Sequence, residues 1–178
     1  RAEIAVTGGF ALRVGGGEIE VASRKAQALL AYLALSEAGS ASRERLAGLL
    51  WSDTDEGHAR TSLRQTLAGL RRALTPVEPP ILDAGRLDVS LRAEEVETDI
   101  DRLVRDIEAG TLDERYLGQA PFNVTVLPGY EGLSPLFDEW LAVIRETARK
   151  LILKTLLNAM QDARLPAPTQ RKFAEVVR

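Results

Sequence analysis

The chain has 178 residues, which is enough for one large domain or two small ones. It has no cysteine, so disulfide bonds and thiolate metal sites are excluded, and no apolar run approaches the roughly 20 residues that a membrane-spanning helix needs. Its net charge of −3 argues mildly against nucleic-acid binding, although affinity for DNA depends on where the positive charges lie.

The start of the sequence has no signal-peptide pattern, and the proportions of hydrophobic and charged residues are those of an ordinary globular protein. We therefore expect a cytoplasmic protein with no membrane partner. The first residue is an arginine, and the last helical pattern is unfinished where the sequence stops. We therefore expect the sequence to be a piece of a longer protein.

Short strands separated by turns are predicted for residues 3–21. The glycines at positions 8–9 and 15–17 can adopt the positive φ values that tight turns require, and the apolar residues between them alternate with other residues. The glycines match neither the GxxxxGK(S/T) loop nor a GxGxxG run followed by a helix. The pattern therefore favours a hairpin over a phosphate-binding loop.

Two helices are predicted next. The first starts after Ser23, which is its expected N-cap, and runs to about Glu37, just before Gly39. The second is short, with Ser42 as its expected N-cap, and ends near Trp51. The position of this tryptophan at the end of an apolar helix favours core packing over base stacking.

A third helix is predicted over residues 58–74, after an acidic turn at residues 52–57 whose carboxylates suit a helix N-terminus. Its apolar residues recur at helical spacing and form one stripe, and its arginines lie off that stripe. An ordinary solvated basic face explains this pattern, and so does a surface for an anionic partner such as the DNA major groove. The stripe is Ala59, Leu63, Leu67, Leu70 and Leu74, and the arginines are Arg60, Arg64, Arg71 and Arg72.

A hairpin is predicted at residues 81–91, because the prolines in the segment TPVEPP end the third helix and two short alternating runs follow. Its turn, Asp83-Ala84-Gly85-Arg86, places Arg86 at the tip. The carboxylates Asp83 and Asp88 are explained by this hairpin without any catalytic role.

A short helix, a turn, a longer basic helix and a hairpin are the parts of a winged helix-turn-helix. Residues 19–91 resemble the DNA-binding domain of OmpR/PhoB-type regulators, and more closely the form found in bacterial transcriptional activators of the SARP class (Streptomyces antibiotic regulatory proteins). The resemblance is carried by ASRKAQALLAYLAL, SRERLAGLLW, HARTSLRQTLAGLRRAL and ILDAGRLDVSL. It implies an α+β winged-helix DNA-binding domain at residues 1–93.

The resemblance implies that the third helix enters the major groove. Residues at spacing i, i+3, i+4 and i+7 share one exposed face and are predicted to read base edges: Thr61, Arg64, Gln65 and Ala68. Phosphate contacts are predicted for arginines that flank this face or lie on the second helix: Arg60, Arg71, Arg72, Arg43 and Arg45. Arg86 is predicted to reach the adjacent minor groove or the backbone.

Residues 94–178 are predicted to be all-α. Asp99 is the expected cap of a helix that ends at Gly110, and residues 111–133 are an expected long loop with apolar anchors, among them Leu117 and Phe122.

The next helix is predicted to start after Ser134 as its N-cap, with Pro135 in its first position, and to run for about 28 residues. A break at residues 165–169 precedes another helix, so one-sided helices repeat as in an incomplete TPR-like array. The segments VETDIDRLVRDIEAG, YLGQ and SPLFDEWLAVIRETARKLIL resemble the bacterial transcriptional activator domain of SARP-like regulators. The segment FNVTVLPGYEGL departs from that pattern.

These features predict a sequence-specific DNA-binding transcriptional regulator. The resemblance implies an activator whose partners are double-stranded promoter repeats and RNA polymerase. The resemblance implies that the helical domain helps to form a homodimer or to dock, and that Asp53, Asp55 and Glu56 contact polymerase. The alternative is a protein-interaction module of a larger regulator whose winged helix no longer binds DNA. The acidic isoelectric point near 5.4 keeps that alternative open.

We predict no enzymatic activity and no cofactor, because the sequence has no arguable Ser/His/Asp set, no cysteine nucleophile and no glycine loop followed by lysine. His58 is the only histidine and has no cysteine partners, so no metal site is predicted there. The pair of carboxylates Asp99 and Asp101 is explained by its position at a helix start, without any catalytic role.

Overall fold

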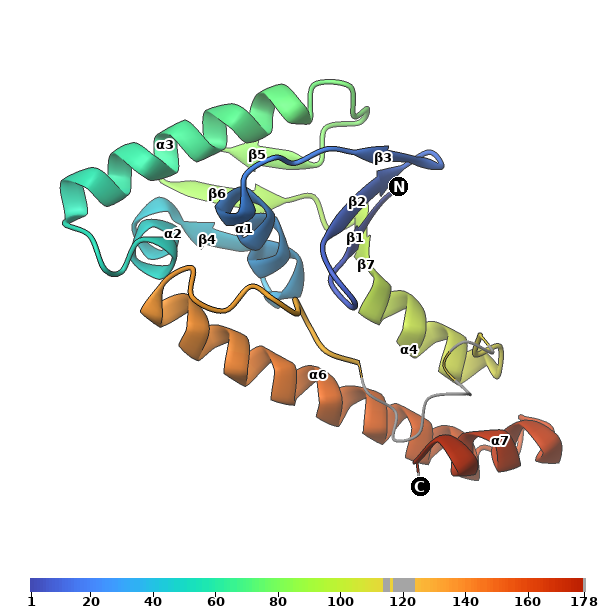
Figure 1. Ribbon diagram of the computed structural model, residues 1–178. Helices are drawn as coiled ribbons and strands as arrows, with labels where there is room; N and C mark the ends of the chain where they lie inside the picture. The colour runs from blue at the N-terminus through green and yellow to red at the C-terminus, as the bar shows by residue number, and fades with distance from the viewer. Residues whose placement is uncertain (114–115, 117–123, 178) are drawn as a thin grey trace.

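The structure is a computed structural model that describes residues 1–113, 116 and 124–177 (Figure 1). Within these residues it is a mixed helix–sheet protein with six helices and two small sheets, so the predicted mixture of helices and strands is confirmed. The strands are β1 (Ala2–Ala5), β2 (Ala11–Val14), β3 (Gly17–Ile19), β4 (Ser40–Ser42), β5 (Leu82–Ala84), β6 (Asp88–Leu91) and β7 (Val96–Thr98). The helices are α1 (Arg24–Leu35), α2 (Arg43–Leu50), α3 (Glu56–Ala73), α4 (Asp99–Ala109), α6 (Pro135–Gln161) and α7 (Ala167–Val177).

The first sheet has the strand order β3-β2-β1-β7. The predicted hairpin region is confirmed by the antiparallel pairs β1–β2 and β2–β3. Strand β7 pairs in parallel with β1 and was missed, because residues 94–178 were expected to be all-α. Val96 and Thr98 are buried while Glu97 is half-buried, but an alternation over three residues is too short to be distinctive.

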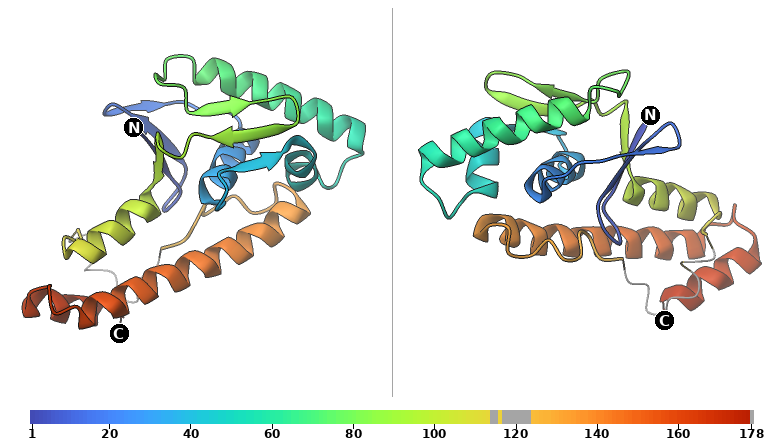
Figure 2. Two further views of the ribbon diagram at one scale, coloured as in Figure 1. Left: turned by 180° about the vertical axis from the view of Figure 1, so that it is seen from behind. Right: turned by 45° about the horizontal axis from the view of Figure 1, so that its top comes forward.

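Helices α1, α2 and α3 pack around the second sheet, whose order is β4-β6-β5 (Figure 2). The predicted N-caps Ser23 and Ser42 are confirmed, since the side chain of each accepts a hydrogen bond from the backbone N–H group three residues ahead. Helix α3 starts at Glu56, earlier than residue 58, because the Asp55 carboxylate accepts the His58 N–H at 2.9 Å and serves as the cap.

Helix α4 is capped by Thr98, which corrects the expectation for Asp99. The Thr98 side chain accepts the backbone N–H of Asp101, and the Asp101 carboxylate accepts the N–H of Thr98, so a capping box forms. Asp99 is instead buried, and its carboxylate oxygens accept the backbone N–H groups of Val6 and Thr7 at 2.9 and 3.0 Å. Gly110 ends the helix in the left-handed conformation at φ 70°, as predicted.

Pro135 occupies the first turn of α6 as predicted, but Ser134 makes no side-chain capping bond. Its hydroxyl instead accepts the backbone N–H of Ser52 at 3.0 Å, which ties the start of α6 to the turn after α2. Helix α7 begins at Ala167, three residues earlier than the pattern after the prolines indicated.

The described part of the 111–133 segment has the expected apolar anchors, since Val126, Leu127 and Tyr130 are buried. The Leu127 N–H donates to the Val6 carbonyl at 2.7 Å, and the Arg145 guanidinium of α6 donates to the carbonyls of Val126 and Leu127. The segment therefore joins β1 to α6. Leu117 and Phe122, which were also named as anchors, lie outside the described residues.

The main hydrophobic core is continuous from the first sheet to the first half of α6. Phe137 and Leu141 of α6 are buried in it, and the Trp140 ring stands edge-on to the Tyr32 ring of α1 with centroids 5.1 Å apart. A second cluster joins α4, the second half of α6 and α7. The division into domains 1–93 and 94–178 stays a prediction, because residues on both sides of it share the main core.

Candidate nucleic-acid interface

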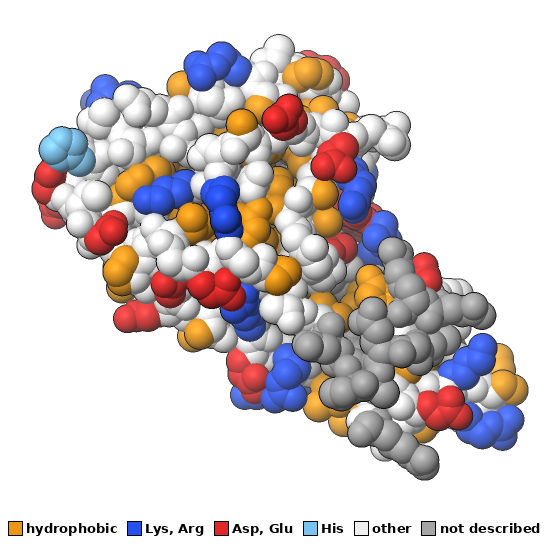
Figure 3. All heavy atoms as spheres, viewed as in Figure 1, with side chains coloured by type: hydrophobic (Ala, Val, Ile, Leu, Met, Phe, Trp, Pro, Cys, Tyr) orange, Lys and Arg blue, Asp and Glu red, His pale blue; other side chains and the backbone are white. Residues whose placement is uncertain are grey.

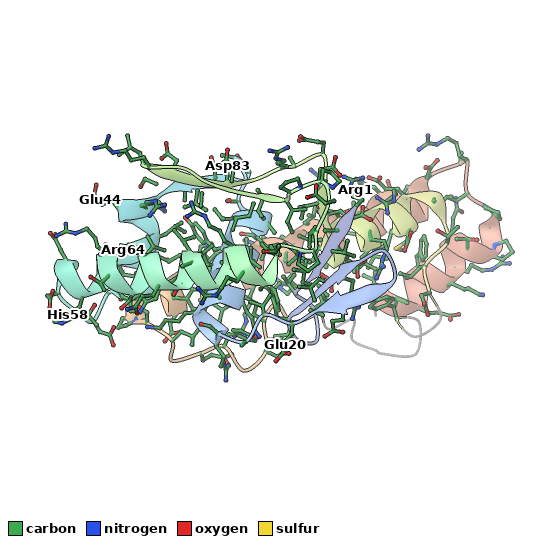
Figure 4. All side chains as sticks on the ribbon, turned by 90° about the horizontal axis from the view of Figure 1, so that it is seen from above. Arg1, Glu20, Glu44, His58, Arg64 and Asp83 are labelled. Carbon is green, nitrogen blue, oxygen red and sulfur yellow. The ribbon has the colours of Figure 1, made fainter. Side chains whose placement is uncertain are left out.

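Helix α3 runs along one surface of the molecule with its apolar stripe turned inward (Figure 4). Ala59, Leu63, Leu67 and Leu70 are buried, as the helical spacing predicted. Most residues off this stripe are exposed, so the core fixes which side of the helix faces solvent. Figure 3 shows Lys and Arg side chains along the edge of the molecule that α3 occupies.

The predicted arginines of α3 are all exposed: Arg60, Arg64, Arg71 and Arg72. Thr61 and Gln65 are exposed too, whereas Ala68 is half-buried. At 3.6 residues per turn, Arg60, Arg64 and Arg71 fall along one edge of the exposed face, and Thr61, Gln65 and Arg72 fall near its middle. The predicted base-reading and phosphate-binding residues therefore form a band along α3.

The β5–β6 hairpin lies beside α3, and its tip, residues 85–87, is held to both neighbouring helices (Figure 2). The Arg71 guanidinium of α3 donates to the Ala84 carbonyl. Arg43 of α2 donates its Nε to the Gly85 carbonyl at 2.8 Å and its backbone N–H to the Leu87 carbonyl at 2.7 Å. These bonds fix the hairpin tip against α2 and α3.

The side chains of the tip itself are presented to solvent. Arg86 is exposed as predicted, and the Leu87 side chain beside it is 74% exposed. Arg86 makes no ion pair or side-chain hydrogen bond with any residue that the structure describes. Its guanidinium is therefore available to an external anion.

A groove of about 940 Å³ lies between α2, the first half of α3 and the hairpin tip. Four arginines line it, namely Arg43, Arg60, Arg64 and Arg86, together with the acidic Glu44 and Glu56. The Glu56 carboxylate lies 4.0 Å from the Arg60 guanidinium, and both side chains are exposed, so this ion pair holds Arg60 only weakly. The groove combines excess positive charge with hydrogen-bond donors that suit a phosphodiester backbone.

Arg45, the other predicted contact on α2, is exposed and donates its Nε to the Tyr32 hydroxyl at 2.8 Å. This hydrogen bond raises the pKa of the Arg45 guanidinium. The four nitrogen-bound hydrogens at the end of the guanidinium have no partner among the described residues, so they can still reach an anion.

The first turn of α1 contains two further cations with aromatic partners. The Arg24 guanidinium lies 4.7 Å from the centre of the Tyr130 ring, and the Lys25 ammonium lies 4.9 Å from that of Trp51. Partial burial lowers the pKa of Lys25. Trp51 is buried, which confirms that it packs in the core.

The acidic turn before α3 is exposed at Asp53, Asp55 and Glu56. The Asp55 carboxylate caps the helix and contacts the imidazole of His58. This contact lowers the pKa of Asp55 and raises that of His58. Among the described residues, no group of three or more His, Cys, Asp or Glu is placed to hold a metal ion.

Sequence reasoning missed the bonds from Arg43 and Arg71 to the hairpin. Both residues were predicted only as phosphate contacts, and a guanidinium that donates to a backbone carbonyl has no sequence signature. The only available signal was that both helices and the hairpin are required to lie together in a winged helix-turn-helix.

No family model matches the chain, and no curated protein matches it in sequence. Among solved structures, it is similar to Mycobacterium tuberculosis EmbR in complex with a low-affinity phosphopeptide, with a TM-score of 0.56 and 18% sequence identity. The match covers 90% of this chain and 47% of EmbR, so the chain spans about half the length of that protein. The similarity shows that the two proteins share a fold over the matched part. None of the described helices is both long enough and apolar enough to cross a membrane.

Proposed function

We propose that the chain is a sequence-specific DNA-binding transcriptional regulator in which α3 enters the major groove. The observation that carries this proposal is the exposed band of arginines on α3 together with Arg86 on the fixed hairpin tip. An α-helix fits the major groove, and a hairpin beside it reaches the next stretch of backbone or minor groove. The fold similarity to EmbR, a regulator of the SARP kind, supports the same function.

Each predicted site residue has a role in this proposal. Thr61, Arg64, Gln65 and Ala68 face base edges, and a bidentate Arg64–guanine or Gln65–adenine pair contributes about 1–3 kcal/mol of base discrimination. Phosphates are contacted by Arg60, Arg71, Arg72, Arg43 and Arg45, and by the hairpin through Arg86. Arg43 and Arg71 can do this while bonded to the hairpin, because each guanidinium has further donors.

The proposal extends to activation of transcription at promoter repeats. Asp53 and Glu56 are exposed beside the DNA-facing helix and are proposed, with Asp55, to contact a basic surface of RNA polymerase. The Asp55 carboxylate is the least available of the three for contact with polymerase, because it already caps α3 and contacts His58. Asp53 is therefore the first position to substitute in a polymerase-binding assay.

The test is a binding titration of the intact chain with a duplex selected from a random-sequence pool, compared with an unselected duplex. We expect Arg64→Ala to reduce the preference for the selected duplex by about 1–3 kcal/mol. We expect Arg72→Ala to weaken binding to both duplexes equally and to lower the slope of log K against log salt by about one. The matched control is Arg171→Ala, an exposed arginine of α7, which should change neither quantity.

Two results would contradict the proposal. If no duplex is enriched and no salt-sensitive complex forms between about 50 and 200 mM salt, the chain does not bind DNA in this way. The docking module would then be the better interpretation, consistent with the net charge of −3. If Arg64→Ala and Arg72→Ala cause identical losses on both duplexes, Arg64 does not read bases.

A further inference from the structure

Leu87, at the tip of the β5–β6 hairpin, is an apolar residue that the fold leaves largely uncovered. It is 74% exposed, which is the highest value among the large hydrophobic residues that the structure describes. The other exposed ones all belong to the surface of one long helix, α6, namely Leu136, Val143, Leu151 and Leu157. A single exposed leucine is ordinary on a protein surface, so exposure alone assigns Leu87 no role.

The backbone around Leu87 is fixed, in contrast to its side chain. The Leu87 carbonyl accepts the backbone N–H of Arg43 at 2.7 Å, and the Gly85 carbonyl accepts the Nε of the same arginine at 2.8 Å. Leu87 is also followed directly by β6, which is the central strand of the second sheet. The hairpin therefore holds an apolar side chain at a fixed place in solvent.

The charges around the tip suit an anionic partner. Arg86, which precedes Leu87, is exposed and lines the groove between α2 and α3 together with three other arginines and two glutamates. The hairpin carboxylates Asp83 and Asp88 lie on the sheet face opposite the buried Val89, because side chains alternate along paired strands. Figure 4 shows Asp83 on the side of the hairpin turned away from α3. The tip therefore presents a cation and an apolar side chain next to each other.

Proteins that bind the minor groove of DNA combine these two chemistries. The negative potential of a narrow minor groove attracts arginine, and leucine is among the apolar residues that insert between neighbouring base pairs. Insertion partly unstacks the bases and bends the duplex by about 20–90° toward the major groove. The bend brings more of the duplex against the protein, which offsets the cost of unstacking.

We propose that Leu87 enters the minor groove as an apolar wedge between two base pairs, so that binding of this chain bends the duplex. The inference rests on the proposed DNA binding, which brings the hairpin tip to the groove beside the one that α3 occupies. Arg86 attracts the tip into that groove. The hydrogen bonds to Arg43 already fix the backbone of Leu87, so little backbone freedom is lost on insertion.

The test measures base unstacking and bending in the complex of the intact chain with the selected duplex. Each purine is replaced in turn by a fluorescent analogue that brightens when it leaves the stack, 2-aminopurine for adenine or 6-methylisoxanthopterin for guanine. Bending is measured by energy transfer between dyes at the two ends of the duplex. We expect the saturated complex to show a rise in fluorescence beneath the hairpin tip and a bend of at least about 20°.

The variants separate the wedge from the other contacts. Leu87→Ala should reduce both the fluorescence rise and the bend at least about twofold, whereas Leu87→Met keeps a long apolar side chain and should retain them. Arg86→Ala should weaken binding and lower the slope of log K against log salt by about one, but its saturated complex should remain bent. The matched control is Val143→Ala, which truncates an exposed apolar side chain of α6 and should change neither quantity.

The wedge and the proposed function fail in different ways. The wedge alone is overturned if the unmodified chain forms a salt-sensitive complex without a bend or a fluorescence rise. It is also overturned if Leu87→Ala, shown by circular dichroism to be folded, leaves both quantities unchanged at saturation. If the unmodified chain forms no complex with any duplex, the proposed function fails and the wedge fails with it.

Discussion

The buried carboxylate of Asp99 accepts hydrogen bonds from the backbone just after strand β1. It accepts the backbone N–H groups of Val6 and Thr7, and it also accepts the hydroxyl of Thr7. Without the carboxylate, the buried N–H of Val6 would have no acceptor, which costs about 1–3 kcal/mol. We therefore expect Asp99→Ala to lower the free energy of unfolding by at least that amount.

Urea denaturation followed by circular dichroism measures this change. Asp99→Asn keeps one acceptor oxygen and should lose less stability than Asp99→Ala. Asp83→Ala removes an exposed carboxylate of β5 and should change the free energy of unfolding by less than about 0.5 kcal/mol. Equal stability of Asp99→Ala and Asp83→Ala would show that the Asp99 hydrogen bonds contribute nothing.

His58 and Asp55 at the start of α3 form a pH-dependent pair. Their contact raises the pKa of His58 above 6.5 and lowers that of Asp55 below 3.8. The stabilisation from the imidazolium is complete below the unfolded pKa of about 6.5 and is lost as pH rises through the raised value. The stabilisation from the carboxylate is complete above about 3.8 and is lost as pH falls through the lowered value.

The pair is therefore strongest between about pH 4 and 6.5. His58 is the only histidine, so its ring resonances can be followed by NMR without assignment of others. We expect the measured pKa of His58 to exceed 6.5 and to fall back toward the ordinary value in Asp55→Asn. An unchanged His58 pKa in that variant would mean that Asp55 is not its partner in solution.

At the scale of single elements, the hairpin tip depends on side chains that come from other elements. Arg43→Ala removes the bond from its Nε to the Gly85 carbonyl but keeps the bond from its backbone N–H to Leu87. We expect NMR relaxation to show faster internal motion of residues 85–87. We expect the free energy of unfolding to fall by no more than about 0.5–1.5 kcal/mol.

The control for this change is Arg45→Ala. Arg45 lies on the same helix but bonds to the Tyr32 hydroxyl, so its loss should leave the motion of the hairpin tip unchanged. If both variants mobilise residues 85–87 to the same extent, the effect comes from α2 as a whole and not from the Arg43 guanidinium.

Elements with long and regular patterns were predictable from the sequence, and those that depend on partners were not. Helix α3 was predicted because five apolar residues recur at helical spacing over more than four turns. The strand β7 was not, since Val96–Thr98 is a strand only because β1 supplies its hydrogen-bond partner. The cap of α4 was misplaced by one residue because Thr98 and Asp99 both suit the N-cap position.

For the candidate site, the sequence predicted which residues are exposed better than what they contact. Arg60, Arg64 and Arg72 are exposed, as the spacing indicated. The bonds of Arg43 and Arg71 to the hairpin follow from the tertiary arrangement of α2, α3 and the second sheet, which local spacing does not determine.

At the scale of the whole molecule, the continuous core predicts cooperative unfolding. The chain has two tryptophans, Trp51 after α2 and Trp140 in α6, and both contact the main core. We expect the single-tryptophan variants Trp51→Phe and Trp140→Phe each to show one fluorescence transition in urea, coincident with the circular-dichroism transition of the same variant. Separate fluorescence and circular-dichroism transitions would show that residues 1–93 and 94–178 unfold independently.

The anchored hairpin tip has one consequence for any duplex that the chain binds. Carbonyls of residues 84, 85 and 87 are already bonded to α2 and α3, so the spacing between the hairpin and α3 is set before contact. Because α3 and the hairpin tip are already fixed to each other, they lose little conformational entropy when a duplex binds. The duplex must then change its shape to fit this surface. Steps that kink easily, such as TA and CA, would then be favoured at positions that no side chain touches.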